Sequence, residues 1–286
     1  MIKATVFADT KCILGEGSWY DGKNGKLYWL DIFGCKVFVH DFASGERKEY
    51  QLDQLVTTIV PKEDGTGFVL GMRDGVYMTD NEFKTFKPFP MPADANFAVR
   101  RCNDGKCAPD GKLWIGVMDL NGAVGQGDQY VVGDSEIYKE IPGIDVPNGI
   151  VWNKAQDTMY FNDTLKAQVY AYDYAPGHVC NQRVIFEAGP GVYTDGMAID
   201  EDDNVWVCLH GGAKVIKIDP RKGELLDYID VPCPQPTSVA LADGKAYITT
   251  AAENLTAEQL AKYPYSGGVF VAETGVKGAA PFRYKG

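Results

Sequence analysis

The sequence has no long hydrophobic run and few basic residues. No apolar stretch in the 286 residues approaches the roughly 20 that a membrane-spanning helix needs. The N-terminal MIKATVFADTKC also lacks the apolar stretch of a signal peptide, and both absences favour a cytoplasmic protein. With 28 Lys and Arg against 39 Asp and Glu, the formal net charge is −11. This charge argues against nucleic acid or an anionic membrane as partner, because both bind basic patches.

The sequence also lacks several patterns of covalent and catalytic chemistry. The seven cysteines are odd in number and scattered, which is typical of reduced thiols rather than a disulfide framework. Cys102 and Cys107 are close together, but no second cysteine pair or nearby histidine completes a zinc site. The G-x-S-x-G and H-E-x-x-H motifs are both missing, which argues against those two classes of hydrolase.

Helical signal is nearly absent. The one stretch with helical character is 255–262, LTAEQLAK, in which Thr256 and Gln259 have the spacing of a capping box. The rest of the chain consists of β-rich runs joined by turns rich in Asp, Asn and Gly, a pattern typical of hairpins. No linker or low-complexity run divides residues 1–286, so we expect a single domain.

An aromatic residue recurs in the second β-rich run of six predicted units. These residues, which differ in position by 40, 46, 46, 46 and 41, are Tyr28, Phe68, Trp114, Tyr160, Trp206 and Tyr247. Four runs in each of six units predict an all-β fold, a six-bladed β-propeller with four-stranded antiparallel blades. A β-sandwich or two small barrels are the alternative, but neither fold requires an aromatic residue to recur every 40 to 46 residues. We expect the N-terminal strand and the last strands to complete one blade jointly, because ring closure removes an exposed edge.

Polar residues recur at one register of four units. Counted back from the marked aromatic of each unit, they are Glu16 at 12 residues, Arg101 and Asn103 at 13 and 11, Asn148 at 12 and Asp195 at 11. Equivalent positions of successive blades are related by rotation about the central channel, so these residues should converge at one end of it. The other two units have milder residues there, namely Val56, Thr57, Thr58, Gln235, Pro236 and Thr237.

Glycine follows Glu16, Asn148 and Asp195. An ordinary turn would explain each case alone, whereas the shared register favours a site. Two carboxylates and an amide oxygen in a channel would repel or lose hydration unless a cation lay among them. Hard oxygen ligands suit Ca²⁺, Mg²⁺ or Mn²⁺, and carboxylates also bind Zn²⁺ and Fe²⁺. Three protein ligands leave coordination positions open, as in a catalytic metal site.

The same residues lie in motifs that resemble the gluconolactonase, regucalcin (senescence marker protein) and luciferin-regenerating enzyme family. The motifs are GEGSWYD, RCNDGKCAPDGKLWIGVMD, PNGIVW, TDGMAID and the tail SGGVFVAETGVKGAAPFRYKG. The resemblance covers nearly the whole chain. It implies a six-bladed propeller with one divalent cation in the channel, and hydrolysis of sugar-acid lactones. By this resemblance Glu16, Asn148 and Asp195 match the metal ligands, Arg101 and Asn103 match the substrate-orienting pair, and Asp104 is a supporting acidic group.

One segment, DLNGAVGQGDQY, departs from the pattern. Some members of the family place an acidic residue near Asn121 against the sugar hydroxyls, whereas this chain has an amide there. Asn121 is therefore a candidate substrate-binding residue, and the choice among glucono-, galactono-, xylono- and arabinono-lactone stays open. The Gly-rich run 122–127 is expected to form either a rim loop or a solvated hairpin tip.

We therefore expect a metal-dependent lactonase. The cation would polarise the lactone carbonyl or acidify the attacking water, and Asp195 would also take a proton from that water. Arg101 and Asn103 would hold ring oxygens or hydroxyls. The alternatives are phosphotriester or aryl-ester hydrolysis at the same site, and a calcium-binding propeller without catalysis. The expected partner is a small sugar lactone, and the expected assembly is a monomer or weak homo-oligomer.

Overall fold

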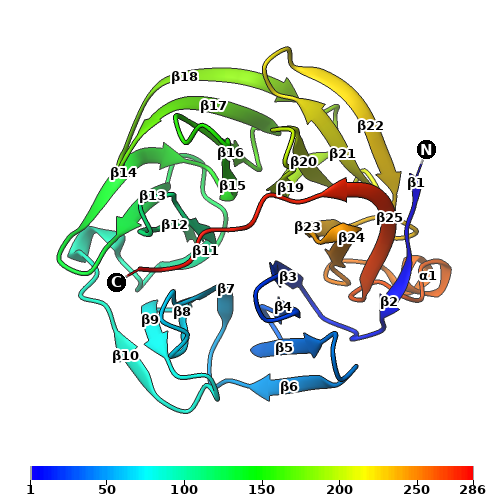
Figure 1. Ribbon diagram of the computed structural model, residues 1–286, viewed down its shortest axis with the longest axis horizontal. Coiled ribbons are helices and arrows are strands. Elements are labelled where there is room, and N and C mark those ends of the chain that lie inside the picture. The colour runs from blue at the N-terminus through cyan, green and yellow to red at the C-terminus, as the bar shows by residue number, and fades with distance from the viewer. Residues whose placement is uncertain (1, 286) are drawn as a thin grey trace.

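The strands form six small sheets arranged in a ring. The computed structural model describes residues 2–285, and Figure 1 shows the sheets around a common centre. The first strand of each blade contacts the first strand of the next, and the sixth contacts the first. This arrangement confirms the predicted six-bladed β-propeller.

The first three blades each contain four antiparallel strands. Blade one consists of β3 (Gly15–Asp21), β4 (Lys26–Asp31), β5 (Lys36–Asp41) and β6 (Arg47–Gln51). Blade two consists of β7 (Val56–Pro61), β8 (Phe68–Met72), β9 (Gly75–Thr79) and β10 (Phe86–Pro88), and the short 3₁₀ helix η1 (Ala93–Ala95) follows it. Blade three consists of β11 (Arg100–Cys107), β12 (Leu113–Asp119), β13 (Gly127–Val132) and β14 (Ile137–Ile144).

The last three blades include both ends of the chain. Blade four consists of β15 (Pro147–Trp152), β16 (Thr158–Asp163), β17 (Gln168–Ala175) and β18 (His178–Glu187). Blade five consists of β19 (Tyr193–Ile199), β20 (Val205–His210), β21 (Lys214–Asp219), β22 (Glu224–Asp230) and β1 (Ile2–Lys3). Blade six consists of β23 (Pro236–Leu241), β24 (Asp243–Thr250), β25 (Val269–Lys277) and β2 (Thr5–Ala8).

The N-terminal segment closes the ring. Strand β2 pairs antiparallel with β25, with Thr5 opposite Val271, which confirms the predicted joint blade. The segment also supplies β1, which pairs parallel with β22 as a fifth strand of blade five. This extra strand was not predicted. It covers part of an edge that would otherwise leave backbone groups unpaired.

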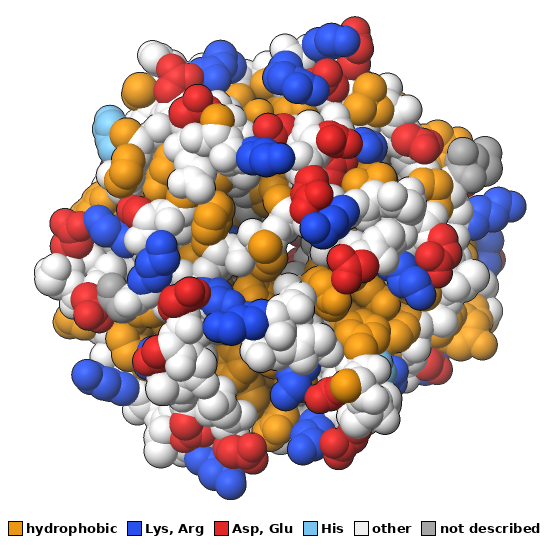
Figure 2. All heavy atoms as spheres, in the orientation of Figure 1, with side chains coloured by type: hydrophobic (Ala, Val, Ile, Leu, Met, Phe, Trp, Pro, Cys, Tyr) orange, Lys and Arg blue, Asp and Glu red, His pale blue; other side chains and the backbone are white. Residues whose placement is uncertain are grey.

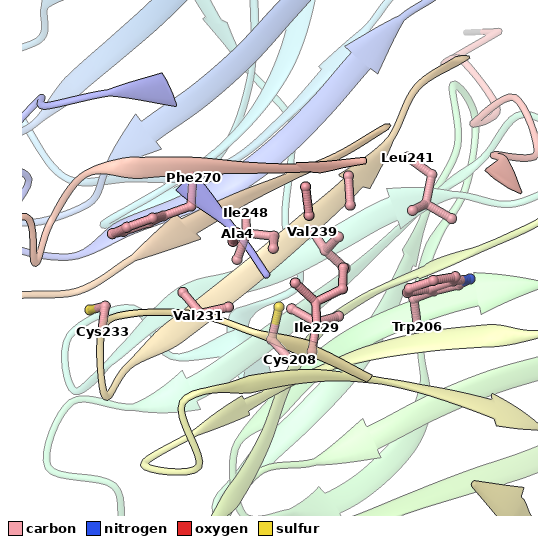
Figure 3. Close-up of a cluster of buried hydrophobic side chains, with 13 residues drawn as sticks. Ala4, Trp206, Cys208, Ile229, Val231, Cys233, Val239, Leu241, Ile248 and Phe270 are labelled. Carbon is pink, nitrogen blue, oxygen red and sulfur yellow. The ribbon is translucent and has the colours of Figure 1, made fainter. Parts of the chain in front are cut away.

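Hydrophobic side chains fill the spaces between neighbouring blades. Between blades five and six, Trp206 and Cys208 belong to one buried cluster with Val239, Ile248 and Phe270 (Figure 3). The aromatics that repeat along the sequence are all buried, so the period that predicts the fold is a period of packing residues. Their burial removes apolar surface from water and stabilises each blade against the next.

The single α-helix, α1 (Ala257–Lys262), begins at a capping box, as predicted. The hydroxyl of Thr256 accepts from the backbone N–H of Gln259, and the Gln259 side chain accepts from the backbone N–H of Thr256. Over residues 2–285, none of the helices has the length and hydrophobicity to cross a membrane. The seven cysteines are free thiols, as predicted.

Glycines allow neighbouring first strands to approach closely. A Cβ built on Gly149 would lie 2.6 Å from the backbone oxygen of Asp195 in the next blade. A Cβ on Gly196 would lie 2.7 Å from the Cβ of Ser238, again one blade further on. Real Cβ atoms do not tolerate such distances, so these positions require glycine to keep the blades together.

Replacing Gly149 with alanine should force blades four and five apart. We expect Gly149→Ala to lower the free energy of unfolding by about 1–3 kcal/mol, the usual cost of overpacking a tight contact. Gly189→Ala is the control, because a Cβ there meets nothing within 4 Å. Urea denaturation followed by circular dichroism measures both. Equal stability of the two variants would contradict the close-approach argument.

Candidate active site

An irregularity interrupts the first strand of every blade at the same place. The pairing of first and second strands shifts register at 16/19, 56/58, 102/105, 147/150, 194/197 and 236/239. A β-bulge takes a residue out of the ladder and re-aims its side chain. The six shifts therefore form a ring of irregular backbone around the channel, and the predicted site residues lie in it or beside it.

Four of these irregularities carry an acid or amide followed by glycine. In each, the side-chain oxygen accepts a hydrogen bond from the glycine N–H; the pairs are Glu16–Gly17 at 3.0 Å, Asp104–Gly105 at 2.8 Å, Asn148–Gly149 at 3.0 Å and Asp195–Gly196 at 3.0 Å. By this repeated contact, Asp104 is the blade-three counterpart of the other three residues. Sequence counting selected Arg101 and Asn103 for that place and gave Asp104 only a supporting position. The Asp104-Gly105 pair is the sequence feature that would have grouped Asp104 with the other three residues.

Asn148 and Asp195 are in direct contact across blades four and five. Nδ2 of Asn148 donates to Oδ1 of Asp195 at 2.6 Å and to Oγ1 of Thr164 at 3.1 Å. Asn162, which is fully buried, donates to the backbone carbonyl of Asp195. Two amides of blade four therefore fix both the side chain and the backbone of Asp195.

Glu16 and Asp195 are buried acids that interact directly, and a hydrogen bond with Glu16 lowers the pKa of Asp195. Their exposed fractions are 8% and 5%. Burial raises the pKa of Glu16 well above its usual value, and repulsion by Asp195 and Asp104 adds to the rise. Burial, followed by repulsion from Asp104, raises the pKa of Asp195 to about 7. Within residues 2–285, no Lys, Arg or His lies within ion-pair distance of Glu16 or Asp195. The site therefore concentrates negative charge that the protein does not neutralise by direct ion pairs.

Lys106 lies further along the same strand than Asp104. Its ammonium group donates to the backbone carbonyl of Met197 in blade five. Burial lowers the pKa of Lys106 and raises that of Asp104, and attraction between the two groups opposes both shifts. The NDGK motif contains Lys106, but this residue lies 8 positions before Trp114, outside the 11 to 13 positions at which the site residues were counted.

Arg101 and Asn103 form a hydrogen-bonded pair, and their role as a substrate-orienting pair stays a prediction. Nη1 of Arg101 donates to Oδ1 of Asn103 at 2.8 Å. The amide of Asn103 donates to the carbonyl of Pro147 at 2.8 Å, and its backbone carbonyl accepts from Thr57 at 2.9 Å and Thr58 at 2.6 Å. Asn103 thus connects blades two, three and four. Arg101 has five N–H donors, and the described residues accept hydrogen bonds only from Nη1.

Asn121 lies apart from this cluster. It is exposed in the hairpin after β12, where its backbone N–H donates to Oδ1 of Asp119 at 2.8 Å. Across the described chain, no hydrogen bond joins its side chain to Arg101, Asn103 or the buried acids. The glycine-rich segment that follows is attached to the connection before blade four, because Gly125 N–H donates to Asp145 at 2.6 Å. A substrate contact for Asn121 stays a prediction.

Glu253 is a second acid near Arg101 that the sequence did not single out. It follows β24 of blade six, and its backbone N–H donates to the carbonyl of Ile13 at 2.9 Å. Burial raises the pKa of Glu253, and the charge of Arg101 opposes the rise. No motif marks this residue, because it lies in the long connection that carries α1. Its proximity to Arg101 follows only from closure of the ring.

The donor set at this end of the channel fits a divalent cation. Two carboxylates, from Glu16 and Asp195, bring negative charge that a cation would neutralise. In the described part of the chain, no group of three His, Cys, Asp or Glu side chains is placed to hold a metal, so the set requires the amide of Asn148. That amide now points its nitrogen at Asp195. Rotation of the amide by half a turn would place its oxygen there instead.

Comparison with known proteins gives relatives along the full length. The chain is 32% identical to YvrE of Bacillus subtilis (strain 168), a proposed sugar lactone lactonase, over 291 residues that cover 99% of each chain. It is 29% identical to the L-arabinolactonase of Azospirillum brasilense over 292 residues, 99% of this chain and 96% of that one.

A solved structure supports the architecture. The calcium-binding protein regucalcin from Agrobacterium tumefaciens strain C58 matches with a TM-score of 0.92 over 99% of this chain and 98% of that chain, at 24% identity. At that identity the match establishes the fold alone. The sequence model described as the SMP-30/gluconolactonase/LRE-like region matches residues 14–252. Because this match spans most of the chain, the protein belongs to the SMP-30/gluconolactonase/LRE-like family.

Proposed function

We propose that this protein hydrolyses the lactone ring of a sugar acid, with a divalent cation held by Glu16, Asn148 and Asp195. The observation that carries the proposal is the buried acid pair of Glu16 and Asp195, which has no ion-pair partner among the described residues and in which Asp195 accepts a 2.6 Å hydrogen bond from Asn148. The names of two relatives, a proposed sugar lactone lactonase and an L-arabinolactonase, support the substrate class.

Asp195 is suited to accept a proton from the attacking water. Its Oδ1 is oriented by hydrogen bonds from Asn148 and from the N–H of Gly196, so the carboxylate is held in one position. A bound divalent cation would supply Lewis acidity toward the carbonyl oxygen or the water. Water adds to the carbonyl carbon, the ring C–O bond breaks, and the ring oxygen takes up the proton that the water loses.

Arg101 and Glu253 are suited to bind the substrate. Arg101 retains N–H donors for the carbonyl or ring oxygen and would stabilise negative charge that develops there. Glu253 would accept hydrogen bonds from sugar hydroxyls through its carboxylate. Position 121, where some family members have an acid, carries an amide in this chain. Asn103 would position Arg101 through the hydrogen bond between them.

The main test replaces Asp195 with asparagine. Asp195→Asn should reduce the rate of lactone opening by about 10²–10⁴-fold, the usual contribution of a general base. Acid release from a panel of aldonolactones, corrected for spontaneous opening, measures the rate, and metal content is determined on the same samples. Asp173→Asn, on an outer strand, is the control. Full turnover by metal-loaded Asp195→Asn would overturn the assignment, and full turnover by chelated wild type would overturn the cation.

The metal-free protein should lose stability as pH rises. A carboxyl group with a higher pKa in the folded than in the unfolded state stabilises the fold below the unfolded value, and this contribution disappears as pH rises through the folded value. For Asp195 the window extends from about 4, the ordinary value, to about 7. We expect the Tm of chelated protein to fall across this window and Asp195→Asn to flatten the fall. A steeper fall in Asp195→Asn than in wild type would contradict this.

Replacing Glu253 with glutamine should affect substrate binding more than turnover. Loss of charge-assisted hydrogen bonds to hydroxyls is expected to raise KM by about tenfold and leave kcat within about twofold. Glu258→Gln is the matched control, because Glu258 is exposed in the first turn of α1 in the same connection. Steady-state kinetics on the preferred lactone separate the two parameters. An unchanged KM in Glu253→Gln would remove this residue from the substrate site.

A further inference from the structure

A cavity of about 350 Å³ lies at the end of the channel opposite the candidate active site. Residues from the far ends of five first strands line it, among them Trp19, Trp152, Ile199 and Leu241. The predicted site residues lie toward the other ends of these strands. The volume falls within the range of about 300–1,000 Å³ that is usual for small-molecule sites.

The C-terminal segment, residues 278–285, forms the roof of this cavity. In Figure 1 it crosses the middle of the ring after β25. Backbone hydrogen bonds attach Ala279 to Ile199 at 3.0 Å, Tyr284 to Pro61 at 3.1 Å and Lys285 to Gly111 at 3.1 Å.

The same segment reaches blade one through a side chain. Arg283 forms an ion pair with Asp21, and its guanidinium lies 5.2 Å from the centre of the Trp19 ring. The segment is thus bonded to blades one, two, three and five and continues from blade six. So many attachments make the roof a fixed part of the fold.

Blade four contacts the roof through apolar packing of Phe282. Over residues 2–285, no hydrogen bond or ion pair connects the C-terminal segment to blade four. The turn after β15 lines the cavity there with Asn153, Lys154 and Gln156. Figure 2 shows hydrophobic atoms exposed near the middle of this face. A ligand would enter between this turn and Phe282.

The walls are largely apolar. Trp19 and Trp152 are each 4% exposed, and Pro281 and Phe282 of the roof complete the lining. Phe282 also packs against the buried cluster that contains Trp152. Aromatic walls favour a ligand with a planar or apolar body.

The unpaired charge in the lining is positive, in a protein whose net charge is −11. The two acids of the lining are already paired, Asp200 with Lys217 at 3.0 Å and Glu201 with Lys277 at 2.8 Å. Of the two lysines of the lining, Lys106 is attracted by Asp104 and donates to the carbonyl of Met197. The exposed Lys154 has no carboxylate within ion-pair distance of its ammonium group among the described residues. A carboxylate, sulfonate or phosphate would complement this charge.

We propose that this cavity is a second binding site, distinct from the candidate active site, for a small organic anion with a planar or apolar body. The rings would lie against Trp19, Trp152 and Phe282, and the anionic group would face Lys154 at the entrance or Lys106 at the inner end. The proposal does not depend on lactone hydrolysis, because its evidence lies at the other end of the channel.

The test uses two matched fluorescent probes. One is 8-anilinonaphthalene-1-sulfonate and the other is N-phenyl-1-naphthylamine, which has the same rings without the sulfonate. Fluorescence titration of the folded protein should give one site and tighter binding of the anionic probe. Lys154→Ala should weaken binding of the anionic probe by about twofold to fivefold, the range of one partly exposed ion pair. It should leave the affinity for the neutral probe unchanged.

Two further variants locate the site. Ala280→Trp places a large side chain on the roof and should abolish binding of both probes, while circular dichroism verifies that it is folded. Lys222→Ala removes an exposed lysine outside the lining and should change the affinity for neither probe. The proposal is overturned if folded Ala280→Trp binds as wild type does, if Lys222→Ala equals Lys154→Ala, or if the two probes bind equally. Lactone-opening rates play no part in these outcomes.

Discussion

The gathering of carboxylic acids from three blades at one end of the channel is the constraint on which the candidate site depends. Glu16, Asp104 and Asp195 come from three blades and lie at one end of the channel, where burial raises the pKa of each. Repulsion from Asp104 adds to the rise at Glu16 and at Asp195. Each acid is held by the N–H of the glycine that follows it. Hydrogen bonds from backbone and amide groups make the buried charge tolerable without neutralising it. The divalent cation that we propose for this site would offset that charge.

The closed ring is what keeps these acids together. Residues as distant along the chain as Glu16 and Asp195 meet only if all six blades hold their places. Closure is made twice, once by β2 on β25 and once by the C-terminal segment across the opposite face. Buried aromatics between blades supply the apolar contact, and Gly149 allows the first strands to approach at the site itself. The contacts that stabilise the ring therefore also hold the site residues in place.

The sequence predicts the blades well, because the period of buried aromatics such as Trp114 and Trp206 is set by packing. It also predicts the contact of Asn148 with Asp195 through their shared register. The bulges limit that reasoning, because side chains along an irregular strand do not alternate simply. Counting by register therefore did not group Asp104 with Glu16, Asn148 and Asp195, although it makes the same contact with the following glycine. Lys106, Glu253 and the roof segment depend on contacts between distant blades, which local patterns do not encode.

The roof made by the last residues has a consequence for how the molecule is synthesised. The segment that crosses the far face leaves the ribosome after every blade has been translated, and β2 must wait for β25 before it can pair. Blades one to five can form before β25 has been translated, whereas blade six stays incomplete until β25 pairs with β2. The last step of ring closure therefore joins segments about 265 residues apart, the kind of contact that forms slowly.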